Sequence, residues 1–158
     1  MTSVANEPPP AEKSESYPGG CHCGYIKYTV ELSPPLYERT VNQCNCSACT
    51  RLGYMLVYPE DKFVTWHNNS EERVARYVFN TKSRDHMFCP KCGTSLGIDF
   101  REVHRAKEGK RYIGVNVRNL DNVKLDKLTM GSFDGVTALE PAHDTAGTWW
   151  DEEKQEMR

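Results

Sequence analysis

Residues 88–94 of the chain read FCPKCGT. The two cysteines of this stretch are separated by two residues, Pro90 pre-sets a tight turn between them, and Gly93 follows the second cysteine. A turn that aims backbone N–H groups at two thiolate sulfurs often ends at a residue with positive φ, a conformation that suits glycine. The stretch is therefore typical of a zinc knuckle.

A second knuckle is predicted at residues 19–25, which read GGCHCGY and again place a glycine directly after the second cysteine. Two knuckles provide four thiolates, enough for a closed tetrahedral zinc site. Such a site would join the start of a strand near residue 20 to a hairpin near residue 90 and contribute much of the folding energy. The predicted structural zinc ligands are Cys21, Cys23, Cys89 and Cys92.

The other three cysteines, Cys44, Cys46 and Cys49, lie in CNCSACTR at residues 44–51, and no cysteine is left to join them. Three interpretations stay open at this point. A histidine could complete a second structural site, the fourth position could be open to water or substrate as in catalytic zinc sites, or the cluster could bind no metal. The candidate histidines for the first interpretation are His67, His86 and His143.

Charge indicates what an open site at these cysteines could do. A zinc ion with three thiolates carries a net charge of −1, so it suits a soft sulfur ligand or a polarised carbonyl better than strong hydroxide chemistry. A thiol from outside the chain would complete the tetrahedron. Glutathione is the abundant thiol of the cytosol, so we expect it as a co-substrate.

Composition limits the class of protein. The 158 residues suit one domain, and 38% of them are hydrophobic. A net charge of −2 gives no basis for binding nucleic acid or an anionic membrane. No apolar run approaches the roughly 18 residues of a membrane span, and the first twenty residues lack a targeting pattern. Seven cysteines cannot all pair within one chain. We therefore expect a cytoplasmic protein with a small-molecule substrate.

Periodicity predicts one mostly β domain. In YIKYTVEL (25–32), apolar Ile26, Tyr28 and Val30 alternate with polar residues, as in a half-buried strand. Further strands are predicted at 54–59, 62–66, 73–79, 85–89, 94–100 and 111–117, and a short helix at SACTRLG (47–53). Three prolines and many polar residues predict a disordered tail at 1–16. The domain is then expected at 17–150, with a charged tail at 151–158.

In chain order, GGCHCG, CNCSACTR and FCPKCGT resemble the glutathione-dependent formaldehyde-activating enzyme family, which also includes centromere protein V. The resemblance covers residues 18–97, and IGVNVRNLD (113–121) is similar to a family strand and turn. It implies an Mss4-like fold of complex β-sheet. The stretch GSFDGVTALEPAHDTAGTWW (131–150) does not match residue by residue, and we expect it to cover the open zinc site.

The resemblance also implies roles for the cysteines. By motif position, the two knuckles match the family's structural zinc ligands, and Cys44, Cys46 and Cys49 match its catalytic zinc site. The implied content is two zinc ions per chain. The family reaction is the condensation of formaldehyde with glutathione, grouped with carbon–sulfur lyases.

Four other residues have both a functional and a structural interpretation. Arg51 could offset the charge of the zinc site or hold a substrate carboxylate, or it could be a surface arginine. Asn116 and Arg118 could contact substrate at a strand end, which an exposed strand end would explain equally well. His143 could be the acid–base residue or a solvated loop histidine.

These observations lead to two classes of function. The first is a zinc-dependent carbon–sulfur lyase or transferase that acts on a glutathione–aldehyde adduct or a related carbonyl metabolite. A variant of it is a glutathione-independent Lewis-acid enzyme for a larger metabolite. The second class is a non-enzymatic zinc module that associates with chromatin or protein. The pI of about 6.2 favours the enzyme.

Overall fold

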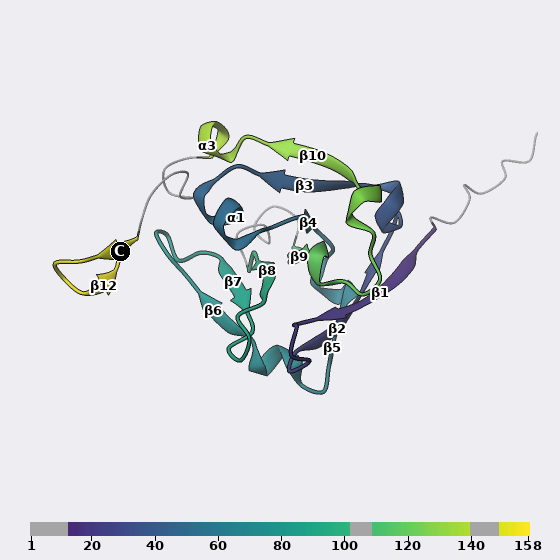
Figure 1. Ribbon diagram of the computed structural model, residues 1–158, viewed down its shortest axis with the longest axis horizontal. Helices are drawn as coiled ribbons and strands as arrows, with labels where there is room; N and C mark the ends of the chain where they lie inside the picture. The colour runs from purple at the N-terminus through teal and green to yellow at the C-terminus, as the bar shows by residue number, and fades with distance from the viewer. Residues whose placement is uncertain (1–12, 102–108, 140–148) are drawn as a thin grey trace, which may run out of the picture.

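The computed structural model describes residues 13–101, 109–139 and 149–158, and there the chain is mostly β, as predicted (Figure 1). The two α-helices of this part are short, α1 (Ser47–Leu52) and α3 (Gly135–Ala138). The strands are β1 (Glu15–Gly20), β2 (Lys27–Leu32), β3 (Thr40–Cys44), β4 (Leu56–Val57), β5 (Val64–His67), β6 (Ala75–Tyr77), β7 (Asp85–Phe88), β8 (Ser95–Asp99), β9 (Ile113–Asn116), β10 (Thr129–Phe133), β11 (Trp150–Asp151) and β12 (Glu156–Met157).

The largest sheet has the strand order β10-β3-β4-β9-β8-β7-β6. All of its neighbouring pairs are antiparallel except β10 and β3, which run parallel from Thr129↔Thr40 to Phe133↔Cys44. This one parallel pair brings the C-terminal part of the chain alongside the end of β3 (Figure 1). The register therefore places Phe133 and the residues after it beside the second cysteine cluster.

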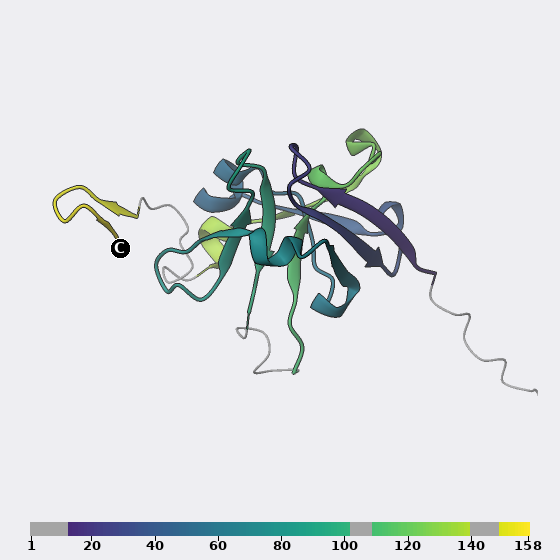
Figure 2. The ribbon, with the colours of Figure 1, turned by 90° about the horizontal axis from the view of Figure 1, so that it is seen from below.

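A three-stranded antiparallel sheet, ordered β1-β2-β5, packs its apolar face into the main core. Ile26, Tyr28 and Val30 are buried, whereas Lys27 and Glu31 are exposed, which confirms the predicted alternation. Figure 2 shows the β1–β2 pair at one side of the molecule and the β11–β12 hairpin at the other. That hairpin contacts the body through the Asn80 N–H, which donates to the Arg158 carbonyl at 3.3 Å.

The strands that local patterns predicted are all present, but five other described strands were not predicted. They are β1 (ESYPGG), β3 (TVNQC), β10 (TMGSF), β11 (WD) and β12 (EM). Proline and glycine interrupt the alternation of apolar and polar residues in β1, and mostly polar residues obscure it in β3. Both strands form through pairing with distant parts of the chain and not through local propensity. The predicted helix at 47–53 is confirmed as α1, and Gly53 ends it at φ +66° in the left-handed region.

The domain limits at residues 16/17 and 150/151 stay predictions. In the described part of the chain, β1 already begins at Glu15, and no helix is long and apolar enough to cross a membrane. His143 lies outside the described residues.

Candidate metal centres and active-site cavity

The two predicted knuckles meet in one cluster. Cys21 and Cys23 lie in the turn between β1 and β2, Cys89 and Cys92 lie in the turn between β7 and β8, and all four sulfurs lie within 4.8 Å of one another. The Cys21 and Cys23 sulfurs are 3.5 Å apart, and those of Cys23 and Cys89 are 3.8 Å apart. Zn–S bonds of about 2.3 Å in a tetrahedron give edges of about 3.8 Å, so the donor set fits zinc.

The backbone of each knuckle is arranged as the sequence predicts. Gly24 has φ +78° and Gly93 has φ +77°, both in the left-handed region. The Ile26 N–H donates to the Cys21 sulfur at 3.2 Å, and the Lys91 N–H donates to the Cys89 sulfur at 3.4 Å. These N–H groups stabilise thiolate charge and orient the sulfurs before a metal binds.

The second cluster consists of Cys44 at the end of β3, Cys46 at the N-cap of α1 and Cys49 within that helix. Their sulfurs also lie within 4.8 Å of one another, and the Cys46 N–H donates to the Cys44 sulfur at 3.4 Å. Among the described residues, no histidine or carboxylate joins this group of three. The described chain thus provides three ligands and leaves the fourth side of a tetrahedron to something else.

The metal-free thiols of the second cluster cannot all ionise together. The Cys49 side chain lowers the pKa of the Cys46 thiol to about 5 through a hydrogen bond. The same interaction and burial raise the pKa of Cys49, and burial raises that of Cys44. A bound dication removes the repulsion among three thiolates, and soft sulfur donors suit zinc. All seven cysteines are free thiols, so both clusters can take part in metal binding.

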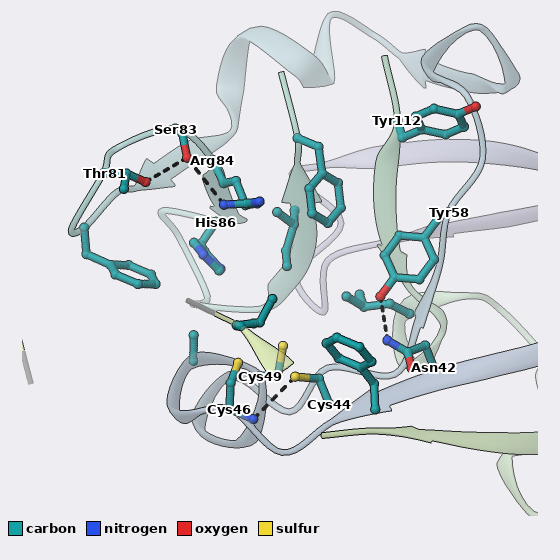
Figure 3. Close-up of a pocket in the computed structure, with 17 residues that line it drawn as sticks. Asn42, Cys44, Cys46, Cys49, Tyr58, Thr81, Ser83, Arg84, His86 and Tyr112 are labelled. Carbon is teal, nitrogen blue, oxygen red and sulfur yellow. Dashed lines mark hydrogen bonds between the residues drawn. The ribbon is translucent and has the colours of Figure 1, made fainter. Parts of the chain in front are cut away.

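A cavity of about 450 Å³ opens over the second cluster, and Cys44, Cys46 and Cys49 all line it. We call it the apolar cavity, because its other walls are mainly aromatic and aliphatic. They include Leu56, Tyr58, Phe79, Ile98, Phe100 and Phe133. Figure 3 shows the three sulfurs on one side of this space and Tyr58, His86 and Arg84 on the others.

His86 is the one described histidine that lines the apolar cavity. It is buried, and its Nδ1 lies 3.1 Å from the Tyr54 hydroxyl. That hydroxyl donates its single proton to the Gly97 carbonyl at 3.0 Å. His86 Nδ1 must therefore donate to Tyr54, which assigns the Nδ1–H tautomer to the imidazole. The Tyr54 ring stacks on the imidazole with the ring centroids 5.9 Å apart.

A second cavity, of about 550 Å³, shares Cys44, Cys49 and Phe133 with the first. We call it the polar cavity, because most of the residues unique to it carry polar or charged side chains. They include Gln43, Asn45, Thr50, Arg118, Ser132 and Asp134. The two cysteines thus form a common wall between an apolar space and a polar one.

Of the stretch that was expected to cover the zinc site, residues 131–139 lie against the second cysteine cluster, whereas Trp149 and Trp150 line neither cavity. Phe133 and Leu139 line the apolar cavity, and Ser132 and Asp134 line the polar one. Asn45 holds this segment in place, since its side-chain amide donates to Asp134 Oδ1 at 2.8 Å and its Oδ1 accepts from the Val136 N–H at 3.0 Å.

The predicted substrate-binding residues lie in three different environments. Arg118 lines the polar cavity. Arg51 lies on α1, donates to the Ser47 carbonyl at 3.2 Å and lines neither the apolar nor the polar cavity. Asn116 is buried and accepts from the Met55 N–H at 3.3 Å, so it connects strands instead of facing either cavity.

Two of the candidate fourth ligands can be located. His67 is exposed on β5 and pairs with the Thr29 hydroxyl at 2.8 Å, away from the second cluster. His86 lines the apolar cavity but is not part of the group of three cysteines. Sequence reasoning did not assign Tyr54, Tyr58 or Phe133 to the site, because each comes from a different strand or loop and has no local signature.

The glutathione-dependent formaldehyde-activating enzyme (GFA) family matches residues 16–142. The chain belongs to this family. The GFA match includes all seven cysteines and the segment over Cys44, and the mostly β, single-domain architecture agrees with the Mss4-like fold. The chain is also similar to the crystal structure of a Rhodobacter sphaeroides protein, with 26% identity, a TM-score of 0.56 and coverage of 72% of this chain and 99% of that chain.

Proposed function

We propose that this GFA-family protein is a zinc-dependent carbon–sulfur lyase or transferase that joins a thiol to an aldehyde and reverses the reaction. Glutathione is the proposed thiol. The observation that carries the proposal is the cluster of Cys44, Cys46 and Cys49, which has three ligands among the described residues and lies between two cavities. A closed structural zinc site would instead have four protein ligands and no open space beside the metal.

Each cysteine cluster has its own role in this proposal. Cys44, Cys46 and Cys49 would hold a catalytic zinc ion, and the chemistry that zinc supplies there is Lewis-acid stabilisation of negative charge on sulfur or oxygen. The two knuckles would hold the second, structural zinc ion. A reducing compartment keeps both sets of thiols available, so we place the protein in the cytoplasm, with a small molecule as its partner and not nucleic acid.

The side chains of the apolar cavity would exclude water and move the proton during the reaction. Its aromatic walls exclude bulk water, which strengthens electrostatic interactions inside. The proton of the thiol must reach the carbonyl oxygen, and His86 lines the same space with its tautomer set by Tyr54. We assign His86 this proton-moving role, while His143 stays a sequence-based candidate. Arg118 is the proposed contact for a glutathione carboxylate, and roles for Arg51 and Asn116 stay predictions.

The test is the rate at which zinc-loaded protein exchanges free aldehyde with its glutathione hemithioacetal, measured by NMR exchange spectroscopy. We expect the wild-type protein to accelerate exchange and the Cys46→Ser protein, folded and with one zinc ion, to fall to the uncatalysed rate. Equal rates for the two proteins would contradict the proposal and favour a zinc-binding interaction module.

A matched pair of histidine variants tests the proton-moving role. His86→Gln should reduce kcat by roughly 100-fold or more, the usual contribution of a general acid–base. His67→Gln replaces a histidine that does not line the apolar cavity and should leave kcat unchanged. An unchanged kcat in His86→Gln would exclude this residue and leave His143 as the candidate.

A further inference from the structure

The apolar cavity is much larger than formaldehyde requires. Its volume of about 450 Å³ lies within the range of about 300–1,000 Å³ that is typical of pockets for drug-sized ligands. Formaldehyde has two non-hydrogen atoms and would leave most of this space filled with water. A cavity of this size next to the cysteine cluster indicates an aldehyde whose carbonyl carbon carries a large substituent, here called the body of the substrate.

The walls of the apolar cavity indicate what kind of body this is. Tyr58 and Phe133 line it, although 41% and 40% of their surface is exposed. Aromatic surface left exposed in a concave site is typical of a binding site for apolar groups. Several polar side chains of the walls bond to one another. The Asn42 amide donates to the Tyr58 hydroxyl at 2.8 Å, and the Thr81 and Ser83 hydroxyls are 2.8 Å apart. Arg84, the charged side chain of this cavity, donates to the Ser83 hydroxyl at 3.4 Å.

The polar cavity differs in the chemistry of its walls. The side chains of Gln43, Asn45 and Thr50 and the charged side chains of Arg118 and Asp134 can pair with the amides, ammonium and carboxylates of a peptide. Among the described walls of the apolar cavity, Arg84 is the one Arg, Lys, Asp or Glu side chain, so a peptide with charges of both signs would find fewer partners there than in the polar cavity. Each half of a thiol–aldehyde adduct therefore has a matching space, and the two spaces meet at Cys44 and Cys49.

We infer that the aldehyde substrate carries an apolar body about the size of a phenylpropyl group, which the apolar cavity holds while the peptide part of the thiol occupies the polar cavity. The reaction class rests on the proposed function. The thiol sulfur forms a bond to the aldehyde carbon, the C=O double bond becomes a C–O single bond, and the thiol proton ends on that oxygen. The step needs no oxidant or reductant.

Helix α1 offers a matched pair of positions for the test. Ala48 and Thr50 flank Cys49 in the sequence, and Ala48 lines the apolar cavity whereas Thr50 lines the polar one. A phenylalanine at either position adds the same ring at the same distance in sequence from the metal ligand. Ala48→Phe should thus fill the apolar cavity, and Thr50→Phe should fill the polar cavity.

The experiment measures binding of two unreactive probes to the zinc-loaded full chain by NMR titration. The probes are 3-phenylpropan-1-ol for the apolar cavity and S-methylglutathione for the polar one. Ala48→Phe should weaken binding of the alcohol by roughly tenfold or more and leave S-methylglutathione unchanged, and Thr50→Phe should do the reverse. Failure of the wild-type protein to bind the alcohol, or equal loss of both probes in both variants, would overturn the inference.

Zinc content and thermal unfolding are measured for each variant, because both substitutions lie next to metal ligands. If either variant loses zinc or fails to fold, Thr81→Phe and Ser132→Phe replace the pair, since both residues are exposed and line the apolar and polar cavities, respectively. The same selective pattern is expected, and its absence in this second pair would also overturn the inference.

Turnover separates the inference from the proposed function. In the wild-type protein, kcat/KM for 3-phenylpropanal should exceed that for formaldehyde by roughly tenfold or more with glutathione as the thiol. A preference for formaldehyde would overturn the inference and leave the proposed function intact. Selective binding of both probes without any turnover would contradict the proposed function, while it would support the assignment of the two cavities.

Discussion

Gly135 lies against the sulfur of Cys44, so closely that a Cβ atom at residue 135 would overlap it. The same Cβ atom would lie 3.2 Å from the Cβ atom of Cys46 and 3.2 Å from Cδ1 of Leu139. Helix α3 thus packs directly on the second cysteine cluster at Gly135. Glycine fits this contact because it has no Cβ atom. The C-terminal segment therefore forms part of the surroundings of the second cysteine cluster.

The first prediction follows from this contact. Gly135→Ala should push Cys44 out of place and reduce metal affinity at the second cluster by roughly 10–100-fold, the usual effect of altering groups behind the ligands. The four-cysteine cluster should keep its metal. Competition with a chelator, followed by metal analysis, measures both. Val136→Ala is the control, because Val136 is exposed and should change nothing. Full retention of two metal ions under the same chelator would contradict the packing argument.

The second prediction compares the two clusters. Cys89→Ser should prevent folding, because the apparent binding energy of a structural zinc ion, about 10–16 kcal/mol, equals or exceeds the usual stability of about 5–15 kcal/mol. Cys46→Ser should leave a folded protein that binds one zinc ion. Circular dichroism and metal analysis check both variants. If Cys46→Ser unfolds as completely as Cys89→Ser does, the second cluster is structural.

The third prediction concerns the two arginines near the second cluster. Arg118→Gln should weaken binding of S-methylglutathione by roughly 5–30-fold, because a charged hydrogen bond in the polar cavity is lost. Arg51→Gln should have little effect, since Arg51 lines neither the apolar nor the polar cavity. Calorimetric titration provides the affinities. The opposite order of effects would show that the ligand lies over the outer face of α1.

The fourth prediction uses an ion-pair network with two buried carboxylates, at the start of β7 and the end of β8 in the large sheet. Asp85 and Asp99 face each other across β7 and β8. Arg76 lies 3.2 Å from Asp85 and 3.4 Å from Asp99, and Arg111 Nε donates to Asp99 Oδ1 at 3.0 Å. Only 3% of the Asp99 side chain is exposed, and its arginine partners are partly exposed and keep other carboxylate partners, so Asp99→Asn should destabilise the fold by about 1.5–3 kcal/mol at pH 7.

The pH dependence of that effect has a definite sign. Burial alone raises the pKa of Asp99, but hydrogen bonds from Arg111 and the Arg101 N–H outweigh it and hold the pKa below its usual 3.8. The stability from the ionised group is then complete above pH 3.8 and is lost as the pH falls through the lower, folded-state pKa. Urea unfolding should therefore show a gap between wild type and Asp99→Asn that narrows in acid. The exposed Asp126→Asn is the control, and a gap independent of pH would contradict the assignment.

Features that depend on neighbouring residues could be predicted from the sequence alone. Turn geometry and strand period involve residues within a few positions of each other. The local features predicted in this way are the knuckle turns with Gly24 and Gly93, the alternation along residues 25–32 and the end of α1 at Gly53. The glycine after each knuckle and the number of cysteines also predicted the division into groups of four and three, which matches the two clusters of sulfurs.

The surroundings of Cys44, Cys46 and Cys49 depend on the tertiary fold and could not be predicted from local sequence. Three interactions join residues about ninety positions apart in the sequence. They are the pairing of β10 with β3, the hydrogen bond from Asn45 to Asp134 and the contact of Gly135 with Cys44. His86 and Phe133 reach the same cavity from different strands of the sheet. Side chains so distant in sequence leave no periodic signal, since their approach depends on sheet order and register, which the packing of the whole chain selects.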